Sequence, residues 1–294
     1  MSILVIGSTG KVGSEVIRAL LARGAKVHAL TRDPKRTTFP SGVTPVKGDT
    51  LDKHSLRAAY SDIDTLFMIN PVARDELPQA LTALSVAAEA GIKRVVYSSM
   101  LNADTFSDTA HAASKYAAER MIERFGLSAT ILRPTYFMQN DLLQMESLFL
   151  RGVYAMPIGS VGVSMVDLRD VAEVAAVELL KRQNSPERLP TTIVEVVGPN
   201  VFTGEGGAAL WSEVLGRRIS YGGDDLDTLE QQIARRTESW LGYDQSLMFR
   251  GFHREGMIPK RESVDILQAK LGKPLRTYRA FAEEMAIQWQ RRSK

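Results

Sequence analysis

No cysteine occurs in the chain, and this absence excludes three kinds of chemistry. A protein without thiols forms no disulfide, uses no thiolate nucleophile and holds no cysteine-ligated metal. Because disulfides belong mainly to secreted proteins, a chain without them is typical of the cell interior, and we expect a cytoplasmic location.

Long apolar runs and a strong charge bias are also missing. The first apolar run covers residues 3–7 with no basic segment before it, and no run approaches the roughly 18 residues that a membrane span needs. The 37 basic and 34 acidic residues leave a net charge of +3, without a long basic run that would suggest a nucleic-acid surface. We therefore expect neither a membrane nor a nucleic acid as partner.

What the sequence does contain is a regular alternation of strand and helix patterns. Apolar runs that predict strands cover residues 3–7, 27–30, 43–46, 64–69, 94–99, 128–133 and 192–197. Apolar residues recur every three or four positions at 53–60, 75–90, 109–124 and 170–181, which predicts helices between most of the strands. This alternation indicates an α/β fold with a Rossmann-type, doubly wound parallel sheet, whose ligand binds beyond the carboxyl ends of the strands.

The pattern changes at residue 199, after which most segments look helical, including residues 227–242. We expect two units: a Rossmann-type, ligand-binding domain over residues 1–198 and a smaller, mostly helical lobe over 199–294 that faces the substrate. The lobe is rich in aromatic side chains such as Trp211 and Phe249, which either pack in its core or line a substrate pocket.

The stretch VIGSTGKVG, residues 5–13, joins the first strand to a helix. Gly7 suits a tight turn, Gly10 lets the backbone approach a ligand, and Gly13 lets the helix pack close to the strand. Backbone N–H groups at the helix start then favour an anion. The alternative is a tight turn that holds no ligand.

An ATP-binding P-loop does not fit this stretch. A P-loop needs four residues between its glycines and Ser or Thr after its lysine, but here Val12 follows Lys11 and only two residues separate the first glycines. We therefore expect a dinucleotide pyrophosphate at Thr9 to Gly13, with Lys11 and Val12 in the loop.

The end of the second strand favours NADP over NAD. An NAD site usually places an acid about 20 residues past the glycines, whereas a 2′-phosphate needs a cation. Here the strand ends in Leu30-Thr31-Arg32, with no acid before Asp33. Arg32 can bind the phosphate through its planar guanidinium and Lys35 can add charge, although a solvated basic turn is the alternative.

Polar residues also follow three further strands. Asp49 is placed to accept a hydrogen bond from the adenine amino group, whereas Asp52 is better explained as a helix N-cap. Asn70 and Pro71 follow the fourth strand, and Ser98 ends the fifth, where chain and cofactor should meet. A strand-end turn without a ligand fits these positions equally well.

The predicted helix over residues 109–124 carries His111, Lys115 and Glu119 on one face, since they are spaced by four. Many short-chain dehydrogenases have Tyr-x-x-x-Lys at this point, and their lysine holds the nicotinamide ribose. Here His111 stands at the tyrosine position, and Tyr116 lies about 100° around the helix from Lys115. Ketone reduction through a tyrosine acid is therefore not expected.

His111 has two possible roles. It can donate a proton near neutral pH, or it can be a structural hydrogen-bonding residue. An acceptor that can take its proton from solvent needs no acid from the protein, so we expect His111 to be dispensable for hydride transfer and Lys115 to be essential.

Six segments together resemble the NmrA-like atypical short-chain dehydrogenases, and among these the NADPH quinone oxidoreductase and triphenylmethane reductase types. They are VIGSTGKVG (5–13), TRDP (31–34), GDTLD (48–52), HAASKYAAERMIERFGLSATILRPTYFMQN (111–140), VDLRDVA (166–172) and LGKPLRTYRAFAEE (271–284). The resemblance covers nearly the whole chain.

This resemblance implies NADP(H) as the cofactor, with Lys115 on its ribose and Pro134, Tyr136 and Phe137 beside the nicotinamide. It implies hydride transfer to a small planar or electron-poor acceptor such as a quinone, an azo compound or a dye, bound between the sheet edge and the C-terminal lobe. We also expect a homodimer. Two alternatives stay open: a redox sensor that binds NADP(H) without turnover, and a reductase in which Lys115 is the base.

Overall fold

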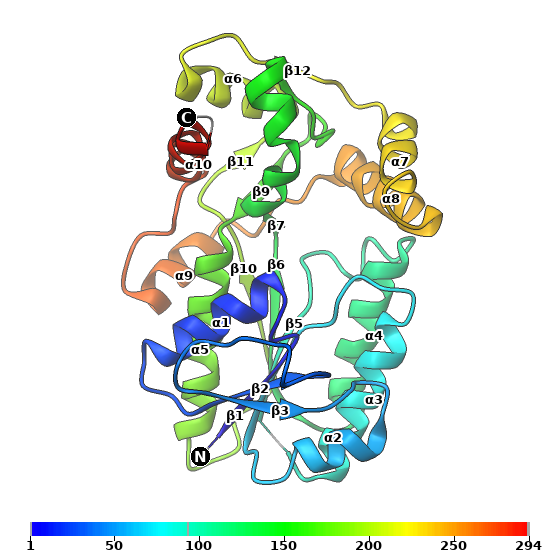
Figure 1. Ribbon diagram of the computed structural model, residues 1–294, viewed down its shortest axis with the longest axis vertical. Helices are drawn as coiled ribbons and strands as arrows, with labels where there is room; N and C mark the ends of the chain where they lie inside the picture. The colour runs from blue at the N-terminus through cyan, green and yellow to red at the C-terminus, as the bar shows by residue number, and fades with distance from the viewer. Residues whose placement is uncertain (1, 93, 293–294) are drawn as a thin grey trace.

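The computed structural model describes residues 2–92 and 94–292 and contains one large parallel sheet (Figure 1). Its strands are β1 (Ile3–Ile6), β2 (Val27–Thr31), β3 (Val43–Lys47), β4 (Thr65–Met68), β5 (Arg94–Ser98), β6 (Ser128–Pro134) and β10 (Thr192–Val196). Their order is β10-β6-β5-β4-β1-β2-β3, and all neighbours pair in parallel. The predicted Rossmann-type sheet is confirmed.

Helices cover both faces of this sheet because its strands are apolar on both sides. In β1, Ile3 and Val5 belong to one hydrophobic cluster, and Leu4 and Ile6 belong to another on the opposite face. The first cluster lies under α1 (Lys11–Leu21), α5 (Leu168–Asn184) and α9 (Ser263–Leu271), and the second lies under α2 (Lys53–Ala59), α3 (Glu76–Glu89) and α4 (Ala110–Arg124).

A second unit, drawn above the sheet in Figure 1, has its own hydrophobic cluster. Its helices are α6 (Gly204–Leu215), α7 (Leu226–Ala234), α8 (Ser239–Glu255) and α10 (Tyr278–Arg292), with the 3-10 helix η1 (Met138–Gln144) and the π-helix η2 (Ser147–Arg151). Five short strands join them, in two small sheets: β7 (Tyr136–Phe137), β8 (Val153–Tyr154), β9 (Val163–Val166), β11 (Val201–Phe202) and β12 (Ser220–Tyr221).

The packing of this unit bears on the expected domain boundary. Residues 138–165 contribute to the same hydrophobic cluster as α6, α8 and α10, whereas α9 packs against α5 on the sheet. The boundary at residue 198 stays a prediction. Among the described residues, no helix combines the length and the apolar content needed to cross a membrane.

The prediction of one helix over residues 227–242 is wrong, because the chain turns back on itself there. Helix α7 ends at Ala234, and in the turn that follows, the Thr237 N–H and hydroxyl both donate to the carbonyl oxygen of Ile233, at 2.9 and 2.8 Å. In α8, Gly242 packs so close to α7 that a Cβ would lie 2.6 Å from the carbonyl oxygen of Glu230. Helix periodicity does not reveal this antiparallel pair.

A buried carboxyl group lies in the core of the second unit. Asp141 is fully buried, and both Tyr278 and Tyr154 donate hydrogen bonds to its Oδ2, the latter at 3.2 Å. The indole N–H of Trp211 donates to the Tyr278 hydroxyl oxygen at 2.8 Å. Burial raises the pKa of Asp141 to about 7, although the tyrosine hydrogen bonds oppose the rise.

This carboxyl should make the fold less stable as the pH rises. Between pH 4 and pH 7 the folded chain keeps a proton on Asp141 that the unfolded chain releases, so the free energy of unfolding falls by up to about 1.4 kcal/mol per pH unit. The free energy of unfolding of Asp141→Asn, measured in urea at several pH values, should not show this decrease with pH. The exposed control Asp265→Asn should still show it. Equal slopes in both variants would contradict the assignment.

Candidate active site

The glycine-rich loop packs tightly against the end of β4. Gly7 has a φ of +77°, and a Cβ there would lie 2.6 Å from the carbonyl oxygen of Ile69. At Gly13 a Cβ would lie 2.1 Å from the carbonyl oxygen of Gly7, which brings α1 close to the loop. Gly10 differs, because its nearest neighbour, the same oxygen, is 3.3 Å away. The positive φ of Gly7 suits the predicted tight turn, and the contact at Gly13 suits the predicted close packing of the helix, whereas the ligand contact of Gly10 stays a prediction.

The start of α1 presents backbone N–H groups to the loop side. No side chain caps this helix, and its first turn carries no acid. The first N–H groups of a helix lack an intrahelical acceptor, so those of Lys11, Val12 and Gly13 can bind an anion. The Val12 side chain is buried in the hydrophobic cluster between the sheet and α1, α5 and α9. Its backbone is therefore the part that can touch a ligand.

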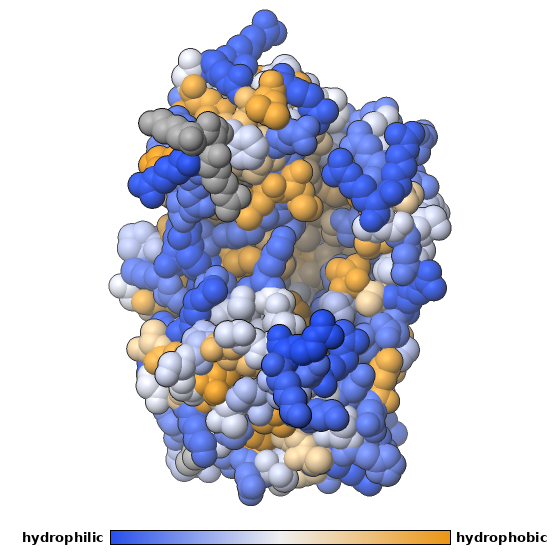
Figure 2. Space-filling view, in the orientation of Figure 1, coloured by the Kyte–Doolittle hydropathy of each residue, from blue (hydrophilic) through white to orange (hydrophobic). Residues whose placement is uncertain are grey.

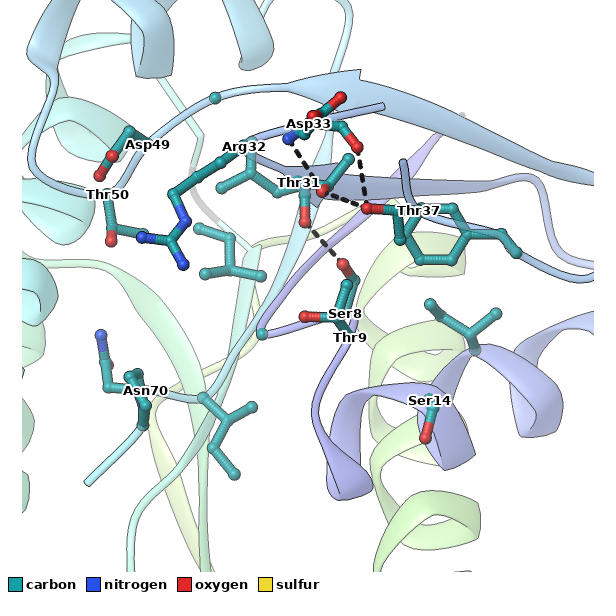
Figure 3. A pocket seen from close by; sticks show the side chains of 18 of the residues that line it. Ser8, Thr9, Ser14, Thr31, Arg32, Asp33, Thr37, Asp49, Thr50 and Asn70 are labelled. Atoms are coloured by element: carbon teal, nitrogen blue, oxygen red, sulfur yellow. Dashed lines mark hydrogen bonds between the residues drawn. The ribbon is translucent and has the colours of Figure 1, made fainter. Parts of the chain in front are cut away.

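A cavity of about 800 Å³ opens beside this loop, at the carboxyl ends of the strands (Figure 3). The chain crosses from one side of β1 to the other between β3 and β4, so the cavity lies at the topological switch point of the sheet. Ser8 ties the loop to β2 by donating its hydroxyl to the carbonyl oxygen of Leu30 at 2.6 Å. Of the predicted residues, the cavity brings together Gly7, Thr9, Arg32, Asp49, Asn70 and Pro71.

Charged residues at and after the end of β2 line part of this cavity. Figure 3 shows Arg32 directed into it beside Thr50, and within the described chain Arg32 forms no ion pair. Asp33 is engaged by its own turn, since its Oδ1 accepts the N–H groups of Lys35 and Arg36 at 3.1 and 3.2 Å. Lys35 lies outside the lining of the cavity, and Arg36 lines it instead.

The two aspartates after β3 have different roles. Asp52 caps α2 by accepting the N–H groups of His54 and Ser55, which confirms the predicted N-cap. The hydrogen bond from the Ser55 N–H, followed by that from His54, lowers the pKa of Asp52. Asp49 lines the cavity, and its Oδ1 accepts the N–H of Leu51 at 2.9 Å. The adenine contact of Asp49 stays a prediction.

Lys115 lies at the carboxyl ends of β4 and β5. Its Nζ donates to the carbonyl oxygens of Ser98 and Asn70 at 3.3 and 3.4 Å, and its side chain is 3% exposed. Burial lowers the pKa of Lys115, and the Glu76 carboxylate 3.2 Å away partly opposes this. Glu119 lies on the same helix face, but its Oε1 and Oε2 accept hydrogen bonds from Nε and Nη2 of Arg133, at 3.0 and 2.6 Å.

Glu76 is the site residue that the sequence did not reveal. Its Oε2 lies 2.7 Å from His111 Nδ1, so one carboxylate contacts both His111 and Lys115. Glu76 is the first residue of α3, where an acid is ordinarily explained by the helix dipole. The only available signal was the pair of basic residues one turn apart on the neighbouring helix, which needs a counter-charge when buried.

Several buried polar atoms near Lys115 have no hydrogen-bond partner among the described residues. They are both side-chain polar atoms of Asn70 and the hydroxyl oxygens of Ser98 and Ser99. Buried polar groups are ordinarily paired, so these atoms fit a ligand that carries hydroxyl and amide groups. Together with the close approach at Gly7 and Gly13, they match the needs of a dinucleotide.

The three predicted residues at the end of β6 and in β7 do not line the cavity. Tyr136 is buried and packs edge-on against Phe249 and Phe252, with ring centroids 6.4 and 6.2 Å apart. Phe137 packs against the hydrophobic cluster between the sheet and α1, α5 and α9. Neither these two nor Pro134 lines the 800 Å³ cavity, so their contact with a nicotinamide stays a prediction. Trp211 and Phe249 belong to the hydrophobic core of the second unit.

A second cavity, of about 570 Å³, lies between α1, η1 and α10. It shares Ser14 and Arg18 with the first, and Lys11 lies on its wall. Figure 2 shows the same face of the molecule hollowed between the sheet and the C-terminal helices, with apolar side chains in the hollow. The carboxyl ends of the sheet strands therefore face open space.

A sequence profile of the NmrA-like family matches residues 1–252. The chain belongs to the NmrA-like family. An NAD(P)H azoreductase from Xenophilus azovorans is 30% identical over 289 residues, which cover 97% of this chain and 98% of that protein. Quinone oxidoreductase 2 from Escherichia coli strain K12 is 25% identical over 224 residues, which cover 74% of this chain and 76% of the relative.

Solved structures of two reductases share the fold. The NADPH complex of an NADPH-dependent quinone oxidoreductase from Escherichia coli superposes with a TM-score of 0.83 at 22% identity, covering 97% of this chain and 99% of that one. The NADP(H) complex of the Citrobacter sp. triphenylmethane reductase gives a TM-score of 0.80 at 20% identity with the same coverage. The family resemblance inferred from the sequence is confirmed.

Proposed function

We propose that this NmrA-like protein is an NADPH-dependent oxidoreductase that transfers a hydride to a small electron-poor acceptor, such as a quinone or an azo compound. The observation that carries the proposal is the cavity at the switch point, which adjoins the glycine-rich turn at Gly7 and holds Arg32, a cation without an ion-pair partner among the described residues. The names of the relatives, an NAD(P)H azoreductase and a quinone oxidoreductase, support the same activity.

Each part of the dinucleotide has candidate residues. The N–H groups of Lys11, Val12 and Gly13 would bind the pyrophosphate, and Arg32 would bind the 2′-phosphate as a bidentate donor. Lys115 would donate to the nicotinamide ribose from the carboxyl end of β5. When bound, NADPH supplies the hydride. The protein contributes orientation and the exclusion of water, which in favourable cases are worth several kcal/mol.

Reversing the charge of Arg32 tests the choice of NADPH over NADH. Arg32→Glu should weaken NADPH binding by about tenfold or more, or about 1.4 kcal/mol, because a phosphate partner is replaced by a repelling carboxylate. NADH affinity should not fall in parallel. The matched control is Lys26→Glu, an exposed reversal at the opposite end of β2. If Arg32→Glu left NADPH affinity unchanged, another cation would recognise the phosphate.

A panel of acceptors tests the activity itself. We expect steady NADPH oxidation with benzoquinone or a neutral azo dye, followed at the nicotinamide absorbance. Tight NADPH binding without turnover on every acceptor would instead support the redox sensor, since that role needs only a cofactor-dependent docking surface.

A further inference from the structure

One carboxylate connects the two basic residues of α4 that face the sheet edge. Glu76 reaches Nδ1 of His111 at 2.7 Å through Oε2 and Nζ of Lys115 at 3.2 Å through Oε1. The side chains of Glu76 and Lys115 are 3% exposed, and that of His111 is 18% exposed. The carboxylate therefore fixes both residues in a largely water-free environment, where hydrogen bonds to charged groups are strong.

The contact determines which nitrogen of His111 is available. A ring nitrogen bonded to a carboxylate carries a hydrogen, so Nδ1 is the protonated atom facing Glu76. Nε2, on the opposite side of the ring, has no acceptor within the described chain. This is the arrangement by which a buried carboxylate orients an imidazole in a catalytic site. When the ring carries its second proton, Nε2–H is the group that can donate it.

The location of His111 fits contact with an acceptor. Lys115, one turn along α4, touches the carbonyl oxygens of Asn70 and Ser98 at the sheet edge. On the other side, the N–H of Ala110 donates to Asp244 of α8 at 2.6 Å, so the start of α4 adjoins the C-terminal helices. The partly exposed ring of His111 thus lies where the sheet edge meets the second unit.

The two classes of acceptor differ in their need for a proton. A hydride added to a quinone, a carbonyl or an azo group forms one new bond to hydrogen and moves the π electron pair onto oxygen or nitrogen, which then needs a proton. A hydride added to the central carbon of a cationic dye neutralises the cation, and no proton is required. A positioned acid therefore speeds up the first class alone.

We propose that Glu76 positions His111 as the proton donor, so that the site favours neutral acceptors whose reduction leaves an anion over cationic dyes. The inference rests on the proposed function. As hydride arrives from NADPH, the Nε2–H bond breaks and the proton bonds to the anionic oxygen or nitrogen. The ring is left neutral with Nδ1–H on Glu76, and it regains a proton from solvent. This proposal replaces the expectation that solvent protonates the acceptor directly.

Turnover at saturating NADPH tests this selectivity. His111→Gln and Glu76→Gln should each lower kcat by about tenfold or more with benzoquinone and a neutral azo dye, and change kcat with a cationic triphenylmethane dye by less than about threefold. The control is Glu178→Gln, an equally buried carboxylate that binds Thr130 and Lys270 on the other face of the sheet. It should leave the ratio of rates unchanged.

Proton NMR of the ligand-free protein gives a second readout. The Nδ1–H of His111, assigned by its loss in His111→Gln, should appear as a protected downfield signal that Glu76→Gln removes. An Nδ1–H signal unaffected by Glu76→Gln, or equal losses of kcat on neutral and cationic acceptors, would overturn the inference. If Glu76→Gln did not fold, His111→Gln would still test the ratio of kcat on neutral acceptors to kcat on the cationic dye. No NADPH oxidation with any acceptor would overturn the proposed function itself.

Discussion

Replacing Gly10 with valine should weaken NADPH binding by about a hundredfold or more while leaving the fold intact. The backbone of Gly10 is extended, with φ −80° and ψ 168°, which a β-branched residue adopts readily. A Cβ there meets only the carbonyl oxygen of Gly7, at 3.3 Å. The added methyl groups would therefore stand over the start of α1, where the pyrophosphate approaches in the proposed site, without disturbing the core.

Two other glycines make this experiment specific. Gly206→Val is the matched control, because its Cβ would meet Thr203 Oγ1 at the same 3.3 Å in a helix remote from the loop. Gly13→Ala should lower the melting temperature instead, since a Cβ 2.1 Å from the Gly7 carbonyl oxygen forces the loop to move. Titration should thus separate a binding defect from a folding defect. Near-normal NADPH affinity in a folded Gly10→Val protein would reject the loop as the phosphate site.

The parts of the fold that follow from local spacing could be predicted from the sequence. The apolar runs of the large sheet, the glycine spacing and the basic end of β2 each depend on a few consecutive residues. Their positions at the carboxyl edge then follow from the parallel topology. Arg32, Asp49 and Asn70 were placed in the cavity by this rule alone, and each one lines it.

The parts that depend on distant contacts could not be predicted in this way. Glu76 lies 35 residues from His111, and nothing in the spacing of either helix indicates that they touch. The two-residue strands β7 and β8 are too short to carry a periodicity. Asp141 looks like a surface acid in the sequence, but its tyrosine partner Tyr278 is 137 residues away. Long-range pairing thus determined what sequence reasoning missed.

Lys115→Ala should reduce hydride transfer by about a hundredfold or more at saturating NADPH. In the proposed site, the ammonium group holds the nicotinamide ribose, and a donor misplaced by about 1 Å can lose this much rate. The substitution also leaves Glu76 buried without its cation, which costs about 3–5 kcal/mol when a buried pair is broken. Lower activity of this variant could therefore reflect poor folding alone.

The double variant Lys115→Met with Glu76→Gln separates the two effects. It removes both charges of the pair while keeping the volume of both side chains, and replacing a buried ion pair by groups of similar size is often neutral for stability. We expect a melting temperature close to that of the parent, together with about a hundredfold lower turnover of a cationic triphenylmethane dye, the acceptor class that needs no proton from His111. A turnover near that of the parent in this folded double variant would show that Lys115 stabilises the sheet edge and does not orient the hydride donor.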